Sequence, residues 1–134
     1  MAISKNPEMK TKYILFALFL IIFHVGCQKD ETNDQIIGKW NWVKTINPWT
    51  SSVSNPQTTG LTQAIEFCTN DIIKEYRNDT LLTASSFKIE TSPAGQLRLF
   101  SSVITSNFTV NKDSLIFNEA YVDGPVISYS RTGN

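Results

Sequence analysis

The side chains that could do covalent or metal chemistry in this chain are few. Its 134 residues include one histidine, His24, and two cysteines, Cys27 and Cys68. A cysteine thiol can carry a lipid, pair in a disulfide, or act as a nucleophile beside a base. Because His24 and Cys27 both follow a strongly apolar stretch, the segment from Phe23 to Glu31 decides which of these chemistries remains open to the chain.

The residues before Cys27 predict a removable leader. Three lysines make the start of the chain positive, at Lys5, Lys10 and Lys12. Residues 13–23 follow as an uncharged apolar run of eleven residues. A membrane-spanning helix needs about 20 apolar residues, whereas the core of a signal peptide needs about 7–15. We interpret residues 1–26 as a cleaved signal peptide, and the alternative is an uncleaved membrane anchor with an incidental cysteine.

The residues around Cys27 sharpen this interpretation. Residues 25–27, Val-Gly-Cys, resemble the lipobox of bacterial lipoproteins, with His24 where leucine is usual. In that family the thiol is diacylated and the chain is cut just before it, which implies lipidation of Cys27. Residues 28–31, Gln-Lys-Asp-Glu, are similar to the export signal of Bacteroidetes lipoproteins, and a plain charged tether is the alternative. The resemblance implies an outer-membrane protein that faces the cell surface and has the membrane as its first partner.

Cleavage before Cys27 would leave 108 residues, enough for one small domain. We assign residues 27–35 to a flexible tether and residues 36–134 to the domain. With 9 basic and 11 acidic side chains the remainder predicts no nucleic-acid binding. It would have no histidine, which excludes Ser-His-Asp and Cys-His catalysis and the usual zinc sites. We therefore expect neither an enzyme nor a cofactor, and interpret Cys68 as a small, at least half-buried side chain.

The elements that must position any site are strands. Eight stretches rich in β-branched and aromatic residues, most of them alternating, are separated by turn signals. They lie at residues 36–46, 62–68, 72–77, 81–90, 97–99, 108–110, 115–117 and 127–131. We predict an all-β protein with a small antiparallel up-and-down barrel of about eight strands, because closure removes exposed edges. Residues 47–60, with two prolines and a final glycine, predict a long loop, and no helix is expected after Cys27.

Residues at the two ends of the predicted barrel resemble lipocalins. Gly38-Lys39-Trp40 opens the first strand like the G-x-W signature of that family, and Arg131 lies near the end of the last strand. The resemblance implies that Arg131 stacks on Trp40 and closes the base of the barrel, a contact worth about 0.5–2 kcal/mol. The chain looks most like the small lipocalin-like lipoproteins of Bacteroidetes. We interpret Gly38, Trp40 and Arg131 as fold residues.

Two functions fit such a barrel. In the first, the mouth and the loop at residues 47–60 hold a small apolar or amphipathic molecule. The aromatic candidates for that ligand site are Trp42, Trp49, Phe67, Tyr76, Phe87 and Phe117. In the second, the barrel is filled and its outer loops contact an unidentified partner protein or a glycan. Trp49 has a simpler interpretation as an aromatic packed against the barrel rim.

Two turns carry a candidate modification. Residues 79–81, Asp-Thr-Leu, and residues 113–115, Asp-Ser-Leu, resemble the sites at which Bacteroidetes attach O-linked glycans to exported proteins. The resemblance makes Thr80 and Ser114 candidate glycosylation sites. The alternative is turn chemistry alone, because aspartate, serine and threonine all favour turns.

Overall fold

The computed structural model of the chain describes residues 31–133. The predicted signal peptide, Cys27 and the first residues of the predicted tether lie outside the described residues. The part from Glu31 onward forms one unit by itself.

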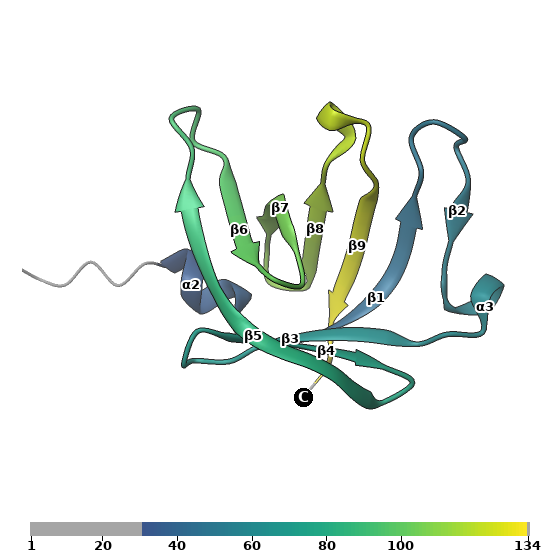
Figure 1. The fold of residues 1–134 in the computed structure, drawn as a ribbon, viewed down its shortest axis with the longest axis horizontal. Helices are drawn as coiled ribbons and strands as arrows, with labels where there is room; N and C mark the ends of the chain where they lie inside the picture. The colour runs from purple at the N-terminus through teal and green to yellow at the C-terminus, as the bar shows by residue number, and fades with distance from the viewer. Residues whose placement is uncertain (1–30, 134) are drawn as a thin grey trace, which may run out of the picture. The chain divides into compact units, whose positions relative to one another are not determined.

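Nine strands account for most of the described residues. They are β1 (Gly38–Ile46), β2 (Val53–Ser54), β3 (Gln63–Phe67), β4 (Ile72–Arg77), β5 (Thr80–Thr91), β6 (Leu97–Ser101), β7 (Thr105–Val110), β8 (Ser114–Asn118) and β9 (Val126–Arg131). Apart from the two-residue β2, each pairs antiparallel with the next, and β9 pairs with β1 (Figure 1). The predicted antiparallel barrel of about eight strands is confirmed, with β2 as an addition at the end of β1.

Alternation along the strands separates the interior from the surface. Trp40 and Trp42 of β1 are buried, whereas Asn41 between them is exposed. Trp40 lies opposite Ile65 of β3, and Trp42 lies opposite Tyr129 of β9. The core inside the barrel consists of Ile36, Trp40, Trp42, Ile65, Phe67, Ile73, Phe87, Leu99, Phe108, Leu115, Phe117 and Tyr129. This period of two is what a sheet with one buried face requires.

Strands β7 and β8 are paired over only part of their length. Their register runs from Val110–Leu115 to Phe108–Phe117 and stops there. The first residues of β7, Thr105 to Asn107, are paired with β6 alone. The two strands therefore separate at the end of the barrel that carries the β8–β9 loop. We call this end the mouth, and the opposite end, at Gly38 and Arg131, the base.

The predicted loop at residues 47–60 is more ordered than expected. It contains β2 and a short helix, α3 (Pro56–Thr59). The Asn55 side chain accepts a hydrogen bond from the Thr58 N–H at 2.9 Å, and Thr58 Oγ1 accepts one from the Asn55 N–H at 3.0 Å. Gly60 ends the helix with φ of 68°. The prediction of a plain loop was wrong, because Asn before Pro and a glycine four residues later form a complete capping arrangement.

The predicted tether is also partly structured. Residues Glu31–Ile36 form the helix α2, although no helix was expected after Cys27. Ile36 is fully buried in the core, which anchors the end of this helix. The folded domain therefore begins five residues earlier than the predicted boundary at residue 36. A third short helix, η1 (Ala120–Val122), lies in the β8–β9 loop.

Candidate functional site

The base of the barrel is closed by the two residues that the lipocalin resemblance singled out. Trp40 is completely buried, and the Arg131 guanidinium carbon lies 4.1 Å from the centroid of the Trp40 ring. The Trp40 indole N–H donates to the Ile36 carbonyl at 2.7 Å, which fixes the end of α2 against the ring. The stacking expected between Arg131 and Trp40 is present, and it is desolvated on the indole side.

Arg131 also donates to three carbonyl groups of two neighbouring segments, the β7–β8 turn and the end of α2 with the residue that follows it. Its Nε donates to Lys112 O at 2.7 Å, its Nη1 to Ile37 O at 2.9 Å, and its Nη2 to Gln35 O. Gly38 leaves room for this side chain, because a Cβ there would lie 2.9 Å from Arg131 Nη1. Gly38 also has φ of 124°, which side chains rarely adopt. These contacts cover Trp40 at the base, and a hollow of about 530 Å³, bordered by α2, the β7–β8 turn and Arg131, lies beside them.

Four of the predicted ligand residues lie in the packed core. Trp42, Phe67, Phe87 and Phe117 are all buried. The rings of Phe67 and Phe87 meet edge to face with their centroids 5.2 Å apart. Phe117 meets Tyr129 in the same way at 5.9 Å. Edge-to-face contacts at these distances are the packing that aromatic rings prefer in a protein core. Within the core, Phe67 therefore contacts Phe87, and Phe117 contacts Tyr129.

Tyr76 does not line the interior. Its predicted inward direction was wrong, because the alternation on β4 turns Ile73 inward and therefore turns Tyr76 outward. The Tyr76 hydroxyl donates to Glu66 Oε2 at 2.7 Å, and Lys39 Nζ lies 4.7 Å from the ring centroid. Trp49 lies outside as well, with 71% of its surface exposed.

The negative charge of the Glu66 carboxylate has a hydrogen-bond donor and positive charges close to it on this outer face. The hydrogen bond from Tyr76 lowers the pKa of Glu66 more than burial raises it, and the positive charges of Lys74 and Lys39 lower it further. Lys74 Nζ lies 3.6 Å from Glu66 Oε2. The same hydrogen bond raises the pKa of Tyr76. A carboxylate held ionised in this way is a poor general acid or base near neutral pH.

Tyr129 is the one titratable core residue with a strongly shifted pKa among residues 31–133. Only 7% of its surface is exposed. Burial raises the pKa of Tyr129 far above its ordinary value, and the negative charge of Glu75 raises it further. Its hydroxyl has no hydrogen-bond partner within residues 31–133, and the group stays neutral. It contributes a neutral polar atom to an otherwise apolar core.

A small hollow opens at the mouth, where β7 and β8 separate. Its volume is about 210 Å³. Its apolar lining consists of Val103, Ile104, Phe117, Pro125 and Ile127, and Glu119 is its one charged side chain. We call it the mouth hollow. Phe117 is thus a predicted ligand residue that both packs in the core and borders an open space.

The β8–β9 loop forms one wall of the mouth hollow and is tightly bonded. Gly124 N donates to Glu119 O at 2.9 Å, and Glu119 N donates to Pro125 O at 3.2 Å. A Cβ on Gly124 would lie 2.6 Å from the Glu119 Cβ, so the loop can close only with glycine there. The Trp49 indole N–H donates to Asp123 O at 3.1 Å. Trp49 therefore braces the wall of the hollow from outside.

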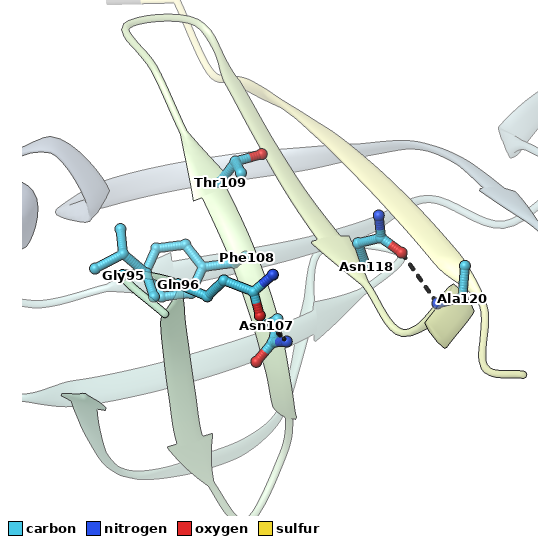
Figure 2. A pocket seen from close by; sticks show the side chains of 8 residues that line it. Gly95, Gln96, Asn107, Phe108, Thr109, Asn118 and Ala120 are labelled. Atoms are coloured by element: carbon cyan, nitrogen blue, oxygen red, sulfur yellow. Dashed lines mark hydrogen bonds between the residues drawn. The ribbon is translucent and has the colours of Figure 1, made fainter. Parts of the chain in front are cut away.

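A second, larger hollow borders the same two strands. Its volume is about 460 Å³, and it is lined by the turn before β6, by β7, and by the end of β8 (Figure 2). Its polar lining consists of Gln96, Asn107, Thr109 and Asn118. We call it the amide hollow. The sequence did not single out these residues, because isolated asparagines and glutamines at strand ends resemble ordinary turn chemistry.

The two candidate glycosylation sites differ in exposure. Thr80 is exposed next to the tight turn at Asn78 and Asp79, both of which have positive φ. Ser114 is half-buried, and its N–H donates to Asn111 Oδ1 at 2.9 Å. Of the two, Thr80 is the more accessible to a modifying enzyme. Cys68 is a free, half-buried cysteine, as its interpretation required.

The fold and these sites define an eight-stranded antiparallel barrel that is compatible with a lipocalin-like fold. Comparison with known proteins found no family model that matches the chain, and no curated protein or solved structure that is significantly similar to it. Among residues 31–133, no helix is long and apolar enough to cross a membrane.

Proposed function

We propose that this chain is a lipid-anchored lipoprotein of the bacterial outer membrane, of the kind found in Bacteroidetes. Its lipocalin-like barrel binds the apolar part of a small amphipathic molecule at the mouth, without catalysing a reaction. The observation that carries the binding proposal is the mouth hollow, whose lining is mostly apolar and whose one charged side chain is Glu119.

The size of the mouth hollow restricts the ligand. Its volume of about 210 Å³ is below the ~300–1,000 Å³ of sites that enclose a drug-sized molecule. Beneath it lies the packed core, to which Phe117 of its lining belongs. The hollow would therefore take one apolar end of a molecule, and the rest would lie across the rim near Glu119. A neutral or cationic head group suits that carboxylate best.

Lipidation of Cys27 would set how the barrel meets the membrane. Only residues 28–30 separate Cys27 from α2, which begins at Glu31. An extended chain spans at most about 3.3–3.6 Å per residue, so this link reaches only on the order of 15 Å. Because the end of α2 is bonded to the base, the proposal keeps the base close to the lipid surface.

Native mass spectrometry tests the binding proposal. We would use the chain from Gln28 onward, produced in a related host so that natural ligands are present. We expect an adduct that is lost on denaturation, and expect Val103→Trp, which fills the mouth hollow, to abolish it. Val43→Trp places the same side chain on an exposed strand position and should keep the adduct. A bare mass under every growth condition would refute the proposal.

Incorporation of a labelled fatty acid tests the anchor separately. We expect the full chain to take up the label and to fractionate with outer membranes, and Cys27→Ser to lose both properties. Protease treatment of intact cells then distinguishes a surface-facing protein from one that faces the periplasm. Uptake of label by Cys27→Ser would contradict the assignment.

A second candidate function is that of an interaction protein with a filled barrel. The edge-to-face packing of Phe67 on Phe87 favours it, because this core is already complete. Apolar side chains exposed on the mouth loops point the same way, among them Trp49 and Val122. In this case the mass spectrum shows no adduct, and surface crosslinking captures a partner that Trp49→Ser releases.

A further inference from the structure

The amide hollow is large enough to be a ligand site of its own. Its volume of about 460 Å³ lies within the ~300–1,000 Å³ typical of small-molecule sites. It owes its shape to the end of the β7–β8 pairing at Phe108–Phe117, beyond which Asn107 and Asn118 are no longer paired with each other. The turn at Gly95 and Gln96 and the start of η1 at Ala120 complete its walls.

The chemistry of the lining restricts the class of ligand. None of the eight lining residues is charged. Four carry neutral hydrogen-bonding groups, namely the amides of Gln96, Asn107 and Asn118 and the hydroxyl of Thr109. A site of this kind offers no ion pair to a phosphate, a carboxylate or an amine. It can still form several hydrogen bonds to a neutral polar molecule.

The side-chain amides are positioned by hydrogen bonds that occupy only some of their donors and acceptors. Asn107 Nδ2 donates to Gln96 Oε1 at 3.2 Å, and Asn118 Oδ1 accepts from the Ala120 N–H at 3.0 Å. Because the donor to Asn118 is a backbone N–H, the Asn118 NH₂ group must be the free end of that amide. Within residues 31–133, the Gln96 NH₂, the Asn118 NH₂ and the Asn107 carbonyl oxygen have no further side-chain partner.

These free groups lie around one space. In Figure 2 the amides of Gln96 and Asn107 lie on one side and that of Asn118 on the other. Leu97, which is half-buried, and Ala120, which is exposed, add apolar surface to the same lining. The lining thus offers both donors and acceptors, held in place before binding, together with small apolar patches. Sugars present matching groups, since their hydroxyls both donate and accept and their C–H faces are apolar.

We propose that the amide hollow binds a neutral carbohydrate, one or two sugar units in size. This site is distinct from the mouth hollow and takes a different class of ligand. The donors of Gln96 and Asn118 contact sugar hydroxyl oxygens, and the Asn107 carbonyl oxygen accepts from a sugar hydroxyl. Thr109, whose side chain is exposed, extends the site along β7.

Nuclear magnetic resonance of the isotope-labelled protein tests this proposal. The full chain, as processed by a bacterial host, would be held in a detergent without sugar head groups. The probes are neutral disaccharides, namely maltose, cellobiose, lactose and diacetylchitobiose. We expect at least one of them, at up to about 50 mM given a millimolar Kd, to shift the side-chain NH₂ signals of Gln96, Asn107 and Asn118. The NH₂ signals of Asn41 and Gln57, which are exposed elsewhere, should not move.

A matched pair of substitutions separates recognition from folding. Asn118→Asp keeps the acceptor for the Ala120 N–H but removes the free donors and adds a charge, so we expect at least a tenfold loss of affinity. Asn111→Asp makes the same change in the β7–β8 turn, where Asn111 Oδ1 also accepts backbone N–H groups. It should bind as the unchanged protein does.

Three results would overturn the proposal. These are no shift with any probe, shifts confined to Asn41 or Gln57, and equal affinity for Asn118→Asp and Asn111→Asp. The Val103→Trp variant distinguishes carbohydrate binding in the amide hollow from the ligand binding proposed above for the mouth hollow. It closes the mouth hollow, and carbohydrate binding should survive it.

Discussion

The base and the mouth of the barrel are made from the ends of the same strands, yet they are built in opposite ways. At the base, Arg131 donates to three carbonyls of two segments and covers the fully buried Trp40. At the mouth, β7 and β8 separate, the mouth hollow opens, and Trp49 is exposed. From this difference we expect the stability of this fold to be concentrated at the base and the mouth to tolerate change.

The largest difference in stability between the two ends is expected when a tryptophan is removed from each. We expect Trp40→Ala to lower the free energy of unfolding by about 3–5 kcal/mol, because it leaves a cavity under Arg131 and Ile36. We expect Trp49→Ala to lower it by less than about 0.5 kcal/mol, because that side chain is mostly exposed. Urea unfolding of the chain from Gln28 onward measures both. Equal losses would contradict the idea that the base carries the stability.

A smaller effect is expected from glycines at the two ends. Gly38→Ala at the base places a Cβ 2.9 Å from Arg131 Nη1 and forces alanine to φ of 124°. We expect it to cost about 2–3 kcal/mol. Gly60→Ala, which follows α3, meets no atom within 4 Å and has φ of 68°. It should cost about 1 kcal/mol.

A double-mutant cycle shows whether the cost at Gly38 comes from Arg131. If the close contact matters, Gly38→Ala should cost less when Arg131→Ala is already present. Additive costs in urea unfolding would assign the loss to backbone strain alone.

Alkaline pH tests the core between the two ends. The folded-state pKa of Tyr129 is raised by burial and then by Glu75, so the folded protein keeps its proton when the unfolded chain loses it. The contribution of Tyr129 to the free energy of unfolding is therefore fully present below about pH 10, which is the pKa of free tyrosine. Above that it should fall by about 1.4 kcal/mol per pH unit on account of this group.

Tyr129→Phe should remove this part of the alkaline loss and change little at pH 7, because the hydroxyl lacks a partner within residues 31–133. Tyr76→Phe gives the comparison on the outer face, where the hydrogen bond to Glu66 also raises the pKa of Tyr76, so this variant should remove a smaller part of the same loss. Chemical denaturation between pH 8 and 11 compares the three proteins. Retention of the full alkaline loss by Tyr129→Phe would show that another group is responsible.

The last prediction concerns local opening of the chain near the mouth. Asn55→Ala removes the cap of α3, and we expect a cost of about 1 kcal/mol. Hydrogen exchange should show faster opening at Thr58 and Thr59, whose amides bond to Asn55, while Trp40 and its neighbours at the base are unchanged. Faster exchange at the base as well would mean that the two ends open together.

The sequence predicted the parts of this molecule that depend on short-range pattern. The alternation around Trp40 and Trp42 predicted β1 and its buried face, and regular turn signals predicted the eight strands. The resemblance of Gly38, Trp40 and Arg131 to the lipocalin signature implied the contact at the base. The capping arrangement at Asn55 to Gly60 was equally local, and it was missed because the segment was assigned to a loop on composition.

The candidate sites depend on contacts that local pattern does not contain. Alternation says that neighbouring side chains face opposite ways, but the register with β3 and β5 decided that Tyr76 faces solvent. The helix α2 exists because carbonyls of residues 35–37 meet Trp40 and Arg131, and Arg131 is about 95 residues away. Six residues of that sequence would not hold a helix alone.

By itself, the sequence determined the class of fold, because that follows from periodicity, and its resemblance to lipocalins implied the Trp40–Arg131 pair. Only the tertiary structure decided where space remains. A hollow is what closely packed neighbours fail to fill, and here it arises where β7 and β8 stop pairing. That stopping point leaves Asn107 and Asn118 on opposite sides of the amide hollow, and no pattern within either strand records it.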